Sequence, residues 1–206
     1  MEIYSSQILA FSDLYGIELI EAGRRKRIGR YRMHADKARC LVAGLLLRFV
    51  LGDKVANICT NAYGKPYLPG ETIEFNLSHS EDYVVIAVDD QPVGIDIEKV
   101  RKRPMAVAKR CCQEEELQWL SAQTDQSSAF YKLWTGKESI VKAVGCGLSL
   151  SPQSFSILPM EASSHRVADR DWYLHWYPFE NYQLCTASVG NKPVKIRVLT
   201  KEELTM

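Results

Sequence analysis

A chain of 206 residues with 46% hydrophobic and 25% charged residues can form one large or two small globular domains with a substantial core. The formal net charge of +1 gives no general attraction to nucleic acid. The first residues lack the basic and apolar regions of a secretory signal, and the longest apolar stretch, 40–51, is too short to span a membrane. The six cysteines form no C-x-x-C pair, so we expect reduced thiols in a cytoplasmic protein.

The N-terminal segments combine a first strand, a basic cluster and a helix. Residues 2–10 alternate weakly between apolar and polar side chains and predict a strand. The segment 24–32 is rich in Lys and Arg, which form either a solvated surface or a phosphate-binding site. From Asp36 to Leu51, apolar residues recur at steps of three and four, which predicts a helix with Arg39 beside its apolar face. An arginine there is usually a surface residue, and the alternative is a second phosphate ligand.

A loop and a further strand follow this helix. The segment 63–70 is dense in glycine and proline and predicts a loop. Residues 75–77 predict a strand that ends at Ser78, His79 and Ser80. A single loop histidine is more often unrelated to function, but flanking hydroxyl groups and backbone amides can together bind an anion.

Two acidic side chains share one face of the next predicted strand, 93–98. Side chains two apart in a strand point to the same face, so Asp96 and Glu98 lie opposite Ile95 and Ile97. On its own this pattern fits a strand with a solvated acidic face. It also fits half of a divalent-cation site, because Mg²⁺ prefers carboxylate oxygens.

The segment 101–104 is the strongest candidate for an internal boundary, and it divides the chain into halves 1–103 and 104–206. Beyond it, residues 107–120 predict a helix with the acidic residues 114–116 on its exposed side. Each half contains helical and strand-like segments, which predicts an α+β fold of two similar halves. Strand character in the second half is found at 155–158, 172–177, 184–189 and 194–199.

The predicted helix 130–144 carries three charged residues of interest. Lys137 lies in the middle of its apolar face, with Glu138 and Lys142 on the edge of that face. Glu138 and Lys142 are four residues apart, so a simple helix salt bridge explains them. It does not explain Lys137, because a lysine within an apolar face is disfavoured unless an anion or a pocket receives it.

Together, the charged residues of both halves fit one kind of ligand. Carboxylates at 96, 98 and 138 can hold Mg²⁺, which would bridge phosphate oxygens, while the cations take the remaining charge of a polyphosphate. The sequence has neither a Walker lysine loop nor a Rossmann glycine fingerprint, so the common nucleotide-binding folds are not indicated.

Four segments resemble the motifs of one enzyme family. The segments 94–98 and 134–139, with Lys142 and the Gly-Cys-Gly-Leu of 145–148, resemble the paired signature of the phosphopantetheinyl transferases. The segments 63–66 and 75–80 resemble further motifs of the Sfp-like (surfactin-synthetase-activating) branch. The resemblance extends from about residue 26 to residue 150, in order and at matching spacing.

This resemblance implies the fold, the reaction and the roles of individual residues. The fold would be two similar halves related by a pseudo-twofold axis, each with a helix on a small antiparallel sheet and with the active site in the cleft between them. The enzyme would transfer the 4′-phosphopantetheine arm of coenzyme A to a serine of an apo acyl or peptidyl carrier protein and release adenosine 3′,5′-bisphosphate. Its catalytic residues would be Asp96, Glu138 and Lys142. Its metal ligands, for Mg²⁺ or alternatively Mn²⁺, would be Asp96, Glu98 and Glu138. Its contacts to coenzyme A would be Lys26, Arg39, Gly64, Lys65, Pro66, Ser78, His79, Lys137 and Lys142.

Some features leave alternatives open. Arg24 or Arg25 could take the place of Lys26, because the basic cluster aligns loosely. Residues 110–113 contain Cys-Cys where related enzymes often have aromatic residues, in a region that meets the carrier protein. A non-catalytic coenzyme-A-binding module and a Mg²⁺-dependent phosphohydrolase or nuclease are the alternative functions. A monomer is expected, because two similar halves in one chain suffice for the site.

Overall fold

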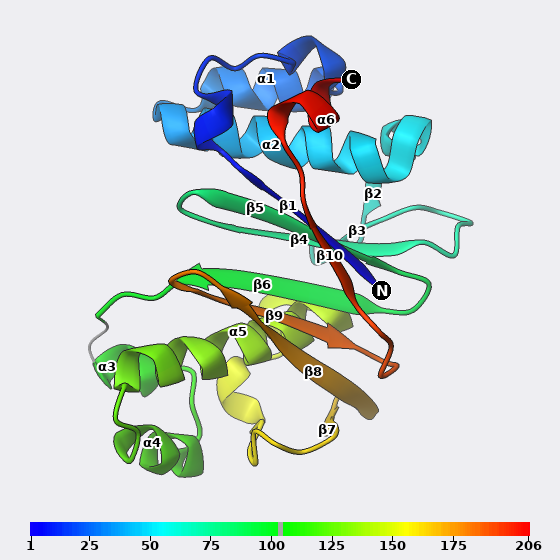
Figure 1. Ribbon diagram of the computed structural model, residues 1–206. Helices are drawn as coiled ribbons and strands as arrows, with labels where there is room; N and C mark the ends of the chain where they lie inside the picture. The colour runs from blue at the N-terminus through cyan, green and yellow to red at the C-terminus, as the bar shows by residue number, and fades with distance from the viewer. Residues whose placement is uncertain (103–104) are drawn as a thin grey trace.

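The computed structural model of this protein describes residues 1–102 and 105–206 as a mixed α+β fold (Figure 1). One four-stranded sheet has the order β10-β1-β5-β4, and another has the order β6-β9-β8-β7. The predicted α+β class is therefore confirmed. The strands are β1 (Glu2–Gln7), β2 (Cys59–Thr60), β3 (Pro66–Tyr67), β4 (Glu74–Ser80), β5 (Tyr83–Asp89), β6 (Val93–Lys99), β7 (His165–Val167), β8 (Arg170–Phe179), β9 (Tyr182–Ser188) and β10 (Lys195–Val198).

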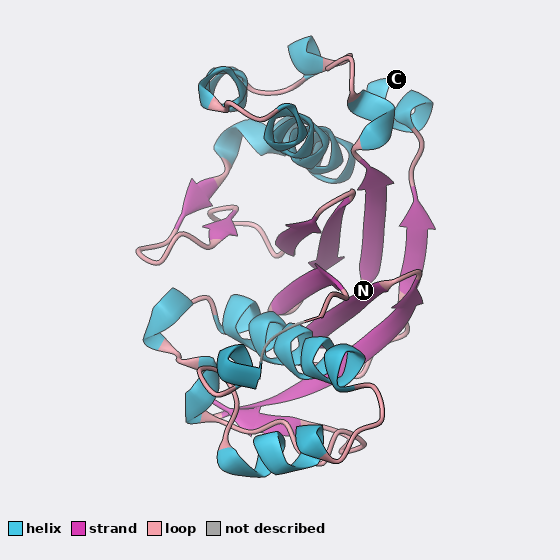
Figure 2. Ribbon diagram, turned by 90° about the vertical axis from the view of Figure 1, so that its left-hand side faces the viewer, coloured by secondary structure: helices cyan, strands magenta, loops and turns pink. Residues whose placement is uncertain are grey.

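Helices cover the sheets at both ends of the molecule (Figure 2). In the first half, α2 lies between α1 and the sheet, and its apolar residues at three- and four-residue steps form the core against β5 (Figure 1). In the second half, α5 packs on β6 and β9. None of the helices in the two described ranges is long and apolar enough to cross a membrane. The helices are α1 (Ala22–Arg30), α2 (His34–Leu51), α3 (Met105–Ala108), α4 (Glu114–Ser121), α5 (Gln126–Val144) and α6 (Lys201–Thr205).

The second half departs from the predicted elements in two places. The helix expected at 107–120 is wrong: it is divided into α3 and α4, because Gln113 and Glu116 form a capping box that begins a new helix. Glu116 belongs to that box and is buried rather than exposed. The strand expected at 155–158 is also wrong, because Lys137 and Glu116 bind backbone groups of this segment in place of a neighbouring strand.

The sheets divide the chain differently from the predicted halves 1–103 and 104–206. Strand β6, from the first predicted half, is an edge strand of the second sheet. Strand β10, from the second predicted half, pairs in parallel with β1 in the first sheet, and α6 contacts α2. The predicted boundary itself, between residues 103 and 104, lies outside the described residues.

The two sheets meet where the edge strands β4 and β6 face each other. Apolar residues of both sheets, including Val85, Ile95 and Leu184, form a shared core there. Alternate backbone N–H groups of β6 donate to polar side chains of β4, which supplies the partners that buried N–H groups require. We call this set the polar ladder: Ile95 N to Asn76 Oδ1 (3.0 Å), Ile97 N to Ser78 Oγ (3.4 Å) and Lys99 N to Ser80 Oγ (3.1 Å).

Candidate active site

Gly94 allows helix α5 to lie directly on strand β6. A Cβ atom at Gly94 would come within 2.0 Å of the carbonyl oxygen of Ser139 and 2.5 Å of the nitrogen of Ala143. Only glycine fits at such a close approach of two backbones. The contact brings Glu138 and Lys142, one helical turn apart on α5, beside the acidic face of β6.

Asp96 is the most enclosed of the three acids, with 4% of its surface exposed. Its Oδ1 accepts hydrogen bonds from Ser78 Oγ at 2.8 Å and from Lys142 Nζ at 2.6 Å. Its Oδ2 is buried and has no hydrogen-bond partner among the residues that the structure describes. A buried carboxylate oxygen without a partner is costly, and a cation bound there would remove that cost.

Glu98 and Glu138 add two more carboxyl groups beside Asp96. Burial raises the pKa of the Glu138 carboxyl, as do the charges of Asp96 and, to a smaller extent, Glu98, although Lys142 opposes this shift. Glu98 accepts a hydrogen bond from Ser80 Oγ at 2.9 Å. Within the described ranges, no three His, Cys, Asp or Glu side chains are already drawn together at metal-binding distances. The oxygen donors and their mutual repulsion nevertheless suit a hard divalent cation such as Mg²⁺.

Lys142 is the cation that faces these acids. Its ammonium group donates to Ser78 Oγ at 2.9 Å, to the carbonyl of Ile95 at 3.2 Å and to Asp96. Lys142 therefore joins α5, β4 and β6 at one point. The predicted residues Ser78, Asp96, Glu98, Glu138 and Lys142 are brought together by the structure.

A groove runs from this cluster across both halves of the molecule. One hollow of about 310 Å³ and a second of about 330 Å³ share Leu77, Glu138 and Lys142 in their linings and therefore lie side by side. The first hollow is lined by Leu77, Ser78, His79, Asp96, Glu98, Trp134, Glu138 and Lys142. The second also contains Tyr63, Gly64, Lys65, Pro66, Asn76, Val141, Gly145, Gly147, Leu150 and Pro152.

The loop between β2 and β3 is fastened to the C-terminal end of α5. Asn61 Nδ2 donates to the carbonyl of Gly145 at 2.8 Å, and Lys65 Nζ donates to that of Ala143 at 2.8 Å. Lys65 Nζ also lies 3.7 Å from Glu74, and burial lowers the pKa of the Lys65 ammonium. Lys65 thus lines the groove beside Gly64 and Pro66, while its charge interacts with the carbonyl end of the helix.

Of the basic residues predicted to bind the 3′-phosphate, His79 and Arg39 lie near each other, and Lys26 is separate from both. His79 lies at the cluster end of the groove, and its pKa is lowered by burial and by the charges of Arg39 and Lys142. Arg39 donates to the carbonyl of Glu81 at 2.9 Å and to Asp36 at 2.5 Å. Lys26 is exposed on α1, and no described hydrogen bond or ion pair connects it to Arg39 or His79.

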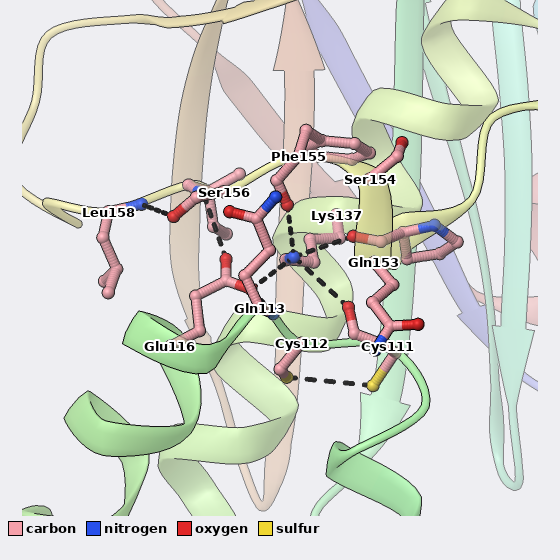
Figure 3. Close-up of polar contacts among 12 residues, drawn as sticks. Cys111, Cys112, Gln113, Glu116, Lys137, Gln153, Ser154, Phe155, Ser156 and Leu158 are labelled. Carbon is pink, nitrogen blue, oxygen red and sulfur yellow. Dashed lines mark hydrogen bonds and ion pairs between the residues drawn. The ribbon is translucent and has the colours of Figure 1, made fainter.

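Lys137 does not lie in the groove. Its side chain is fully buried, and Figure 3 shows its ammonium group directed at Glu116 and at backbone carbonyl groups of two other segments. The carbonyl acceptors are Phe155 at 2.6 Å, Pro152 at 2.8 Å and Cys111 at 3.2 Å. The structure therefore contradicts the prediction that Lys137 contacts coenzyme A. The sequence pattern required an anion or a pocket to receive Lys137, and Glu116 together with these carbonyl groups meets that requirement.

Several groove residues were not assigned a role from the sequence. Trp134 lies beside Glu98 and Glu138, and Asn76, Leu150 and Pro152 line the far end. The sequence contained a signal for Asn76, because polar residues at 76, 78 and 80 share one face of a strand that carries Phe75 and Leu77 on the other face.

Two family models match most of this chain. A family model described as the 4′-phosphopantetheinyl transferase superfamily matches residues 92–187, and one described as the 4′-phosphopantetheinyl transferase N-terminal region matches residues 14–91. The first of these matches includes Asp96, Glu98, Glu138 and Lys142.

Three curated relatives carry the same description. The 4′-phosphopantetheinyl transferase gsp of Aneurinibacillus migulanus is 41% identical over 62% of this chain and 57% of its own length. The 4′-phosphopantetheinyl transferase Sfp of Bacillus subtilis (strain 168) is 36% identical over 68% of this chain and 67% of its own length. The transferase psf-1 of Bacillus pumilus is 34% identical over 76% of this chain and 74% of its own length. The chain belongs to the 4′-phosphopantetheinyl transferase superfamily, in its Sfp-like branch. The match spans less than two thirds of the gsp relative.

Proposed function

We propose that this protein transfers the 4′-phosphopantetheine arm of coenzyme A to a serine hydroxyl of an apo acyl or peptidyl carrier protein. The observation that supports this most directly is the convergence of Asp96, Glu98, Glu138 and Lys142 at a groove shared by both halves. Family membership gives the reaction class, and the groove has the charge pattern that a metal-bound pyrophosphate requires.

The adenosine end of coenzyme A would lie along this groove. His79 and Arg39 would bind the 3′-phosphate, and the loop 63–66 would contact the adenine. Lys26 joins the phosphate site in this proposal only if α1 or its side chain moves toward Arg39. Lys137 is left out, because it is buried against Glu116.

Asp96, Glu98 and Glu138 would hold Mg²⁺, or Mn²⁺ in its place. When bound, the cation would neutralise pyrophosphate charge and strengthen the electrophilic character of the phosphorus. The unpartnered Oδ2 of Asp96 supports this assignment. Lys142, which forms an ion pair with Asp96 in this structure, would also stabilise negative charge on the leaving phosphate.

Glu138 would accept the proton of the incoming serine, directly or through water. Its raised pKa makes it a better base than an ordinary carboxylate once it is ionised. The serine oxygen would form a bond to the phosphorus that carries pantetheine, and the bond from that phosphorus to adenosine 3′,5′-bisphosphate would break. Most of the rate gain would come from positioning and charge stabilisation.

The finer architecture belongs to the same proposal. The helix–sheet pairs α2 with β5 and α5 with β6 would be pseudo-twofold equivalents, with the active site in the cleft between them. One chain would supply all of the residues named, so the protein would act as a monomer, and its place would be the cytoplasm.

Intact-protein mass spectrometry tests the proposed function. An apo carrier protein incubated with this protein, coenzyme A and Mg²⁺ should gain one phosphopantetheine group, and EDTA should prevent the gain until excess Mg²⁺ is added. Coenzyme A binding without transfer to carriers of several classes would favour the non-catalytic module. Release of adenosine 3′,5′-bisphosphate without an acceptor would favour a phosphohydrolase.

A further inference from the structure

We propose that Ser80 is a positioning residue that sets the orientation of Glu98 for metal binding, through the polar ladder between β4 and β6. The inference rests on the proposed function only in taking Glu98 as a metal ligand.

Two steps of the polar ladder have the same arrangement. Ser78 Oγ accepts from the N–H of Ile97 and donates to Asp96, the residue before Ile97. Ser80 Oγ accepts from the N–H of Lys99 and donates to Glu98, the residue before Lys99. The arrangement thus repeats two residues further along both strands, as the strand period requires.

The repeat explains how a hydroxyl group can orient a carboxylate. A serine hydroxyl has one donor hydrogen and two acceptor lone pairs. The N–H of Lys99, held in place by the backbone of β6, occupies a lone pair of Ser80 at 3.1 Å and restricts the directions open to the hydroxyl hydrogen. That hydrogen is donated to Glu98 Oε2 at 2.9 Å. This hydrogen bond limits the rotamers of the Glu98 side chain before a cation binds. Glu98 therefore loses less conformational entropy when it binds the cation.

Asn76 is an internal control for this interpretation. Its Oδ1 accepts from the N–H of Ile95 at 3.0 Å, as the serines do for their own partners. The residue before Ile95 is Gly94, which has no side chain to orient. Asn76 therefore binds a backbone N–H of β6, as the two serines do, but it orients no carboxylate.

The experiment compares Ser80→Ala, Ser80→Thr and Asn76→Ala with the unmodified protein. Binding of Mn²⁺ is followed by electron paramagnetic resonance, and stability by urea unfolding in the absence of metal. Ser80→Ala should weaken Mn²⁺ binding by about 10- to 100-fold, the usual loss when a ligand's supporting hydrogen bond is removed. Ser80→Thr keeps the hydroxyl group and should bind Mn²⁺ within a few-fold of the unmodified protein. Asn76→Ala should lower the urea midpoint and leave Mn²⁺ affinity nearly unchanged.

Transfer assays provide a second readout. Ser80→Ala should raise the Mg²⁺ concentration needed for half-maximal rate, while KM for coenzyme A at saturating Mg²⁺ should change little. Equal loss of Mn²⁺ affinity in Ser80→Ala and Asn76→Ala would overturn the inference, because the ladder would then act only through stability. Unchanged Mn²⁺ affinity in Ser80→Ala would also overturn it.

The same experiments separate this inference from the proposed function. If Mn²⁺ binds in an Asp96-dependent manner and Ser80→Ala weakens it, but no carrier is modified, the positioning role stands and the transferase proposal fails. If no Asp96-dependent Mn²⁺ binding occurs, the positioning role is overturned together with the assigned metal site.

Discussion

Lys137 and Glu116 form an ion pair in which neither side chain is exposed to solvent. The pair joins α5 to α4, and its atoms also bind the loop that contains Pro152 and Phe155. Because Pro152 lines the groove, this buried pair connects the core of the second half to one wall of the candidate active site.

Removing one member of this pair should strongly destabilise the protein. Lys137→Met leaves Glu116 charged and buried, and losses of about 3–5 kcal/mol are typical of such broken pairs. The double variant Lys137→Met with Glu116→Leu should regain a large part of that loss. Urea unfolding measures both effects, and the exposed pair Arg166–Asp171 provides a control whose loss should have little effect. A double variant no more stable than the single one would show that the hydrogen bonds of Lys137 and Glu116 to backbone groups, rather than the pairing of their charges, dominate.

Gly94→Ala should separate α5 from β6. The added methyl group would lie 2.0 Å from a backbone oxygen, which cannot move without shifting the helix. We expect a loss of roughly 1–3 kcal/mol or more in unfolding free energy, together with loss of metal binding. Gly29→Ala on α1 is the matched control, because a Cβ there meets nothing within 4 Å, and it should be neutral or stabilising by about 1 kcal/mol. A normally stable and active Gly94→Ala protein would contradict the close approach.

The stability of the metal-free protein should depend on the ionisation of Glu138. Its pKa is raised in the folded state, so between its ordinary value and the raised value the folded protein binds more protons than the unfolded chain. Stability contributed by this group is therefore lost as the pH rises through that window. Glu138→Gln should gain stability relative to the unmodified protein over the same window, as measured by urea unfolding in EDTA. Added Mg²⁺ should stabilise the unmodified protein more than this variant, and a pH-independent difference would argue against the raised pKa.

Arg39→Ala should weaken coenzyme A binding more than dephospho-coenzyme A binding. The loss of a charge-assisted hydrogen bond is typically about 1.5–3 kcal/mol, so calorimetry should show a roughly 10- to 100-fold weaker Kd for coenzyme A alone. Lys26→Ala is the informative comparison, because Lys26 lies on α1 without a described contact to Arg39. A selective loss in Lys26→Ala would place this lysine in the phosphate site. Equal losses for both ligands in Arg39→Ala would exclude Arg39 from that site.

The acidic strand β6 and the helix α5 could be predicted from the sequence because their signals are local. Period-two alternation placed Asp96 and Glu98 on one face, and the helical period placed Glu138 and Lys142 on one edge. The helix begins at Gln126 rather than near residue 130, because Asp125 caps it by accepting from the N–H of Ser128 at 3.0 Å. That capping signal was present in the sequence.

Other features depended on pairings between distant segments. The partner of Lys137 lies 21 residues earlier on a different helix, and no periodicity connects the two. The predicted strand at 155–158 had apolar residues in a suitable pattern, but its backbone groups are bound by Lys137 and Glu116. Tertiary context therefore decided against local propensity at this segment.

The pairing of β10 with β1 has a consequence for how the chain is made. The ribosome must synthesise the whole of the second sheet before residues 195–198 can join the edge of the first. During translation, the side of β1 that β10 will cover stays open, and an unpaired strand edge can associate with other chains. We therefore expect nascent chains that stop short of residue 195 to depend on chaperones more than chains that include β10 do.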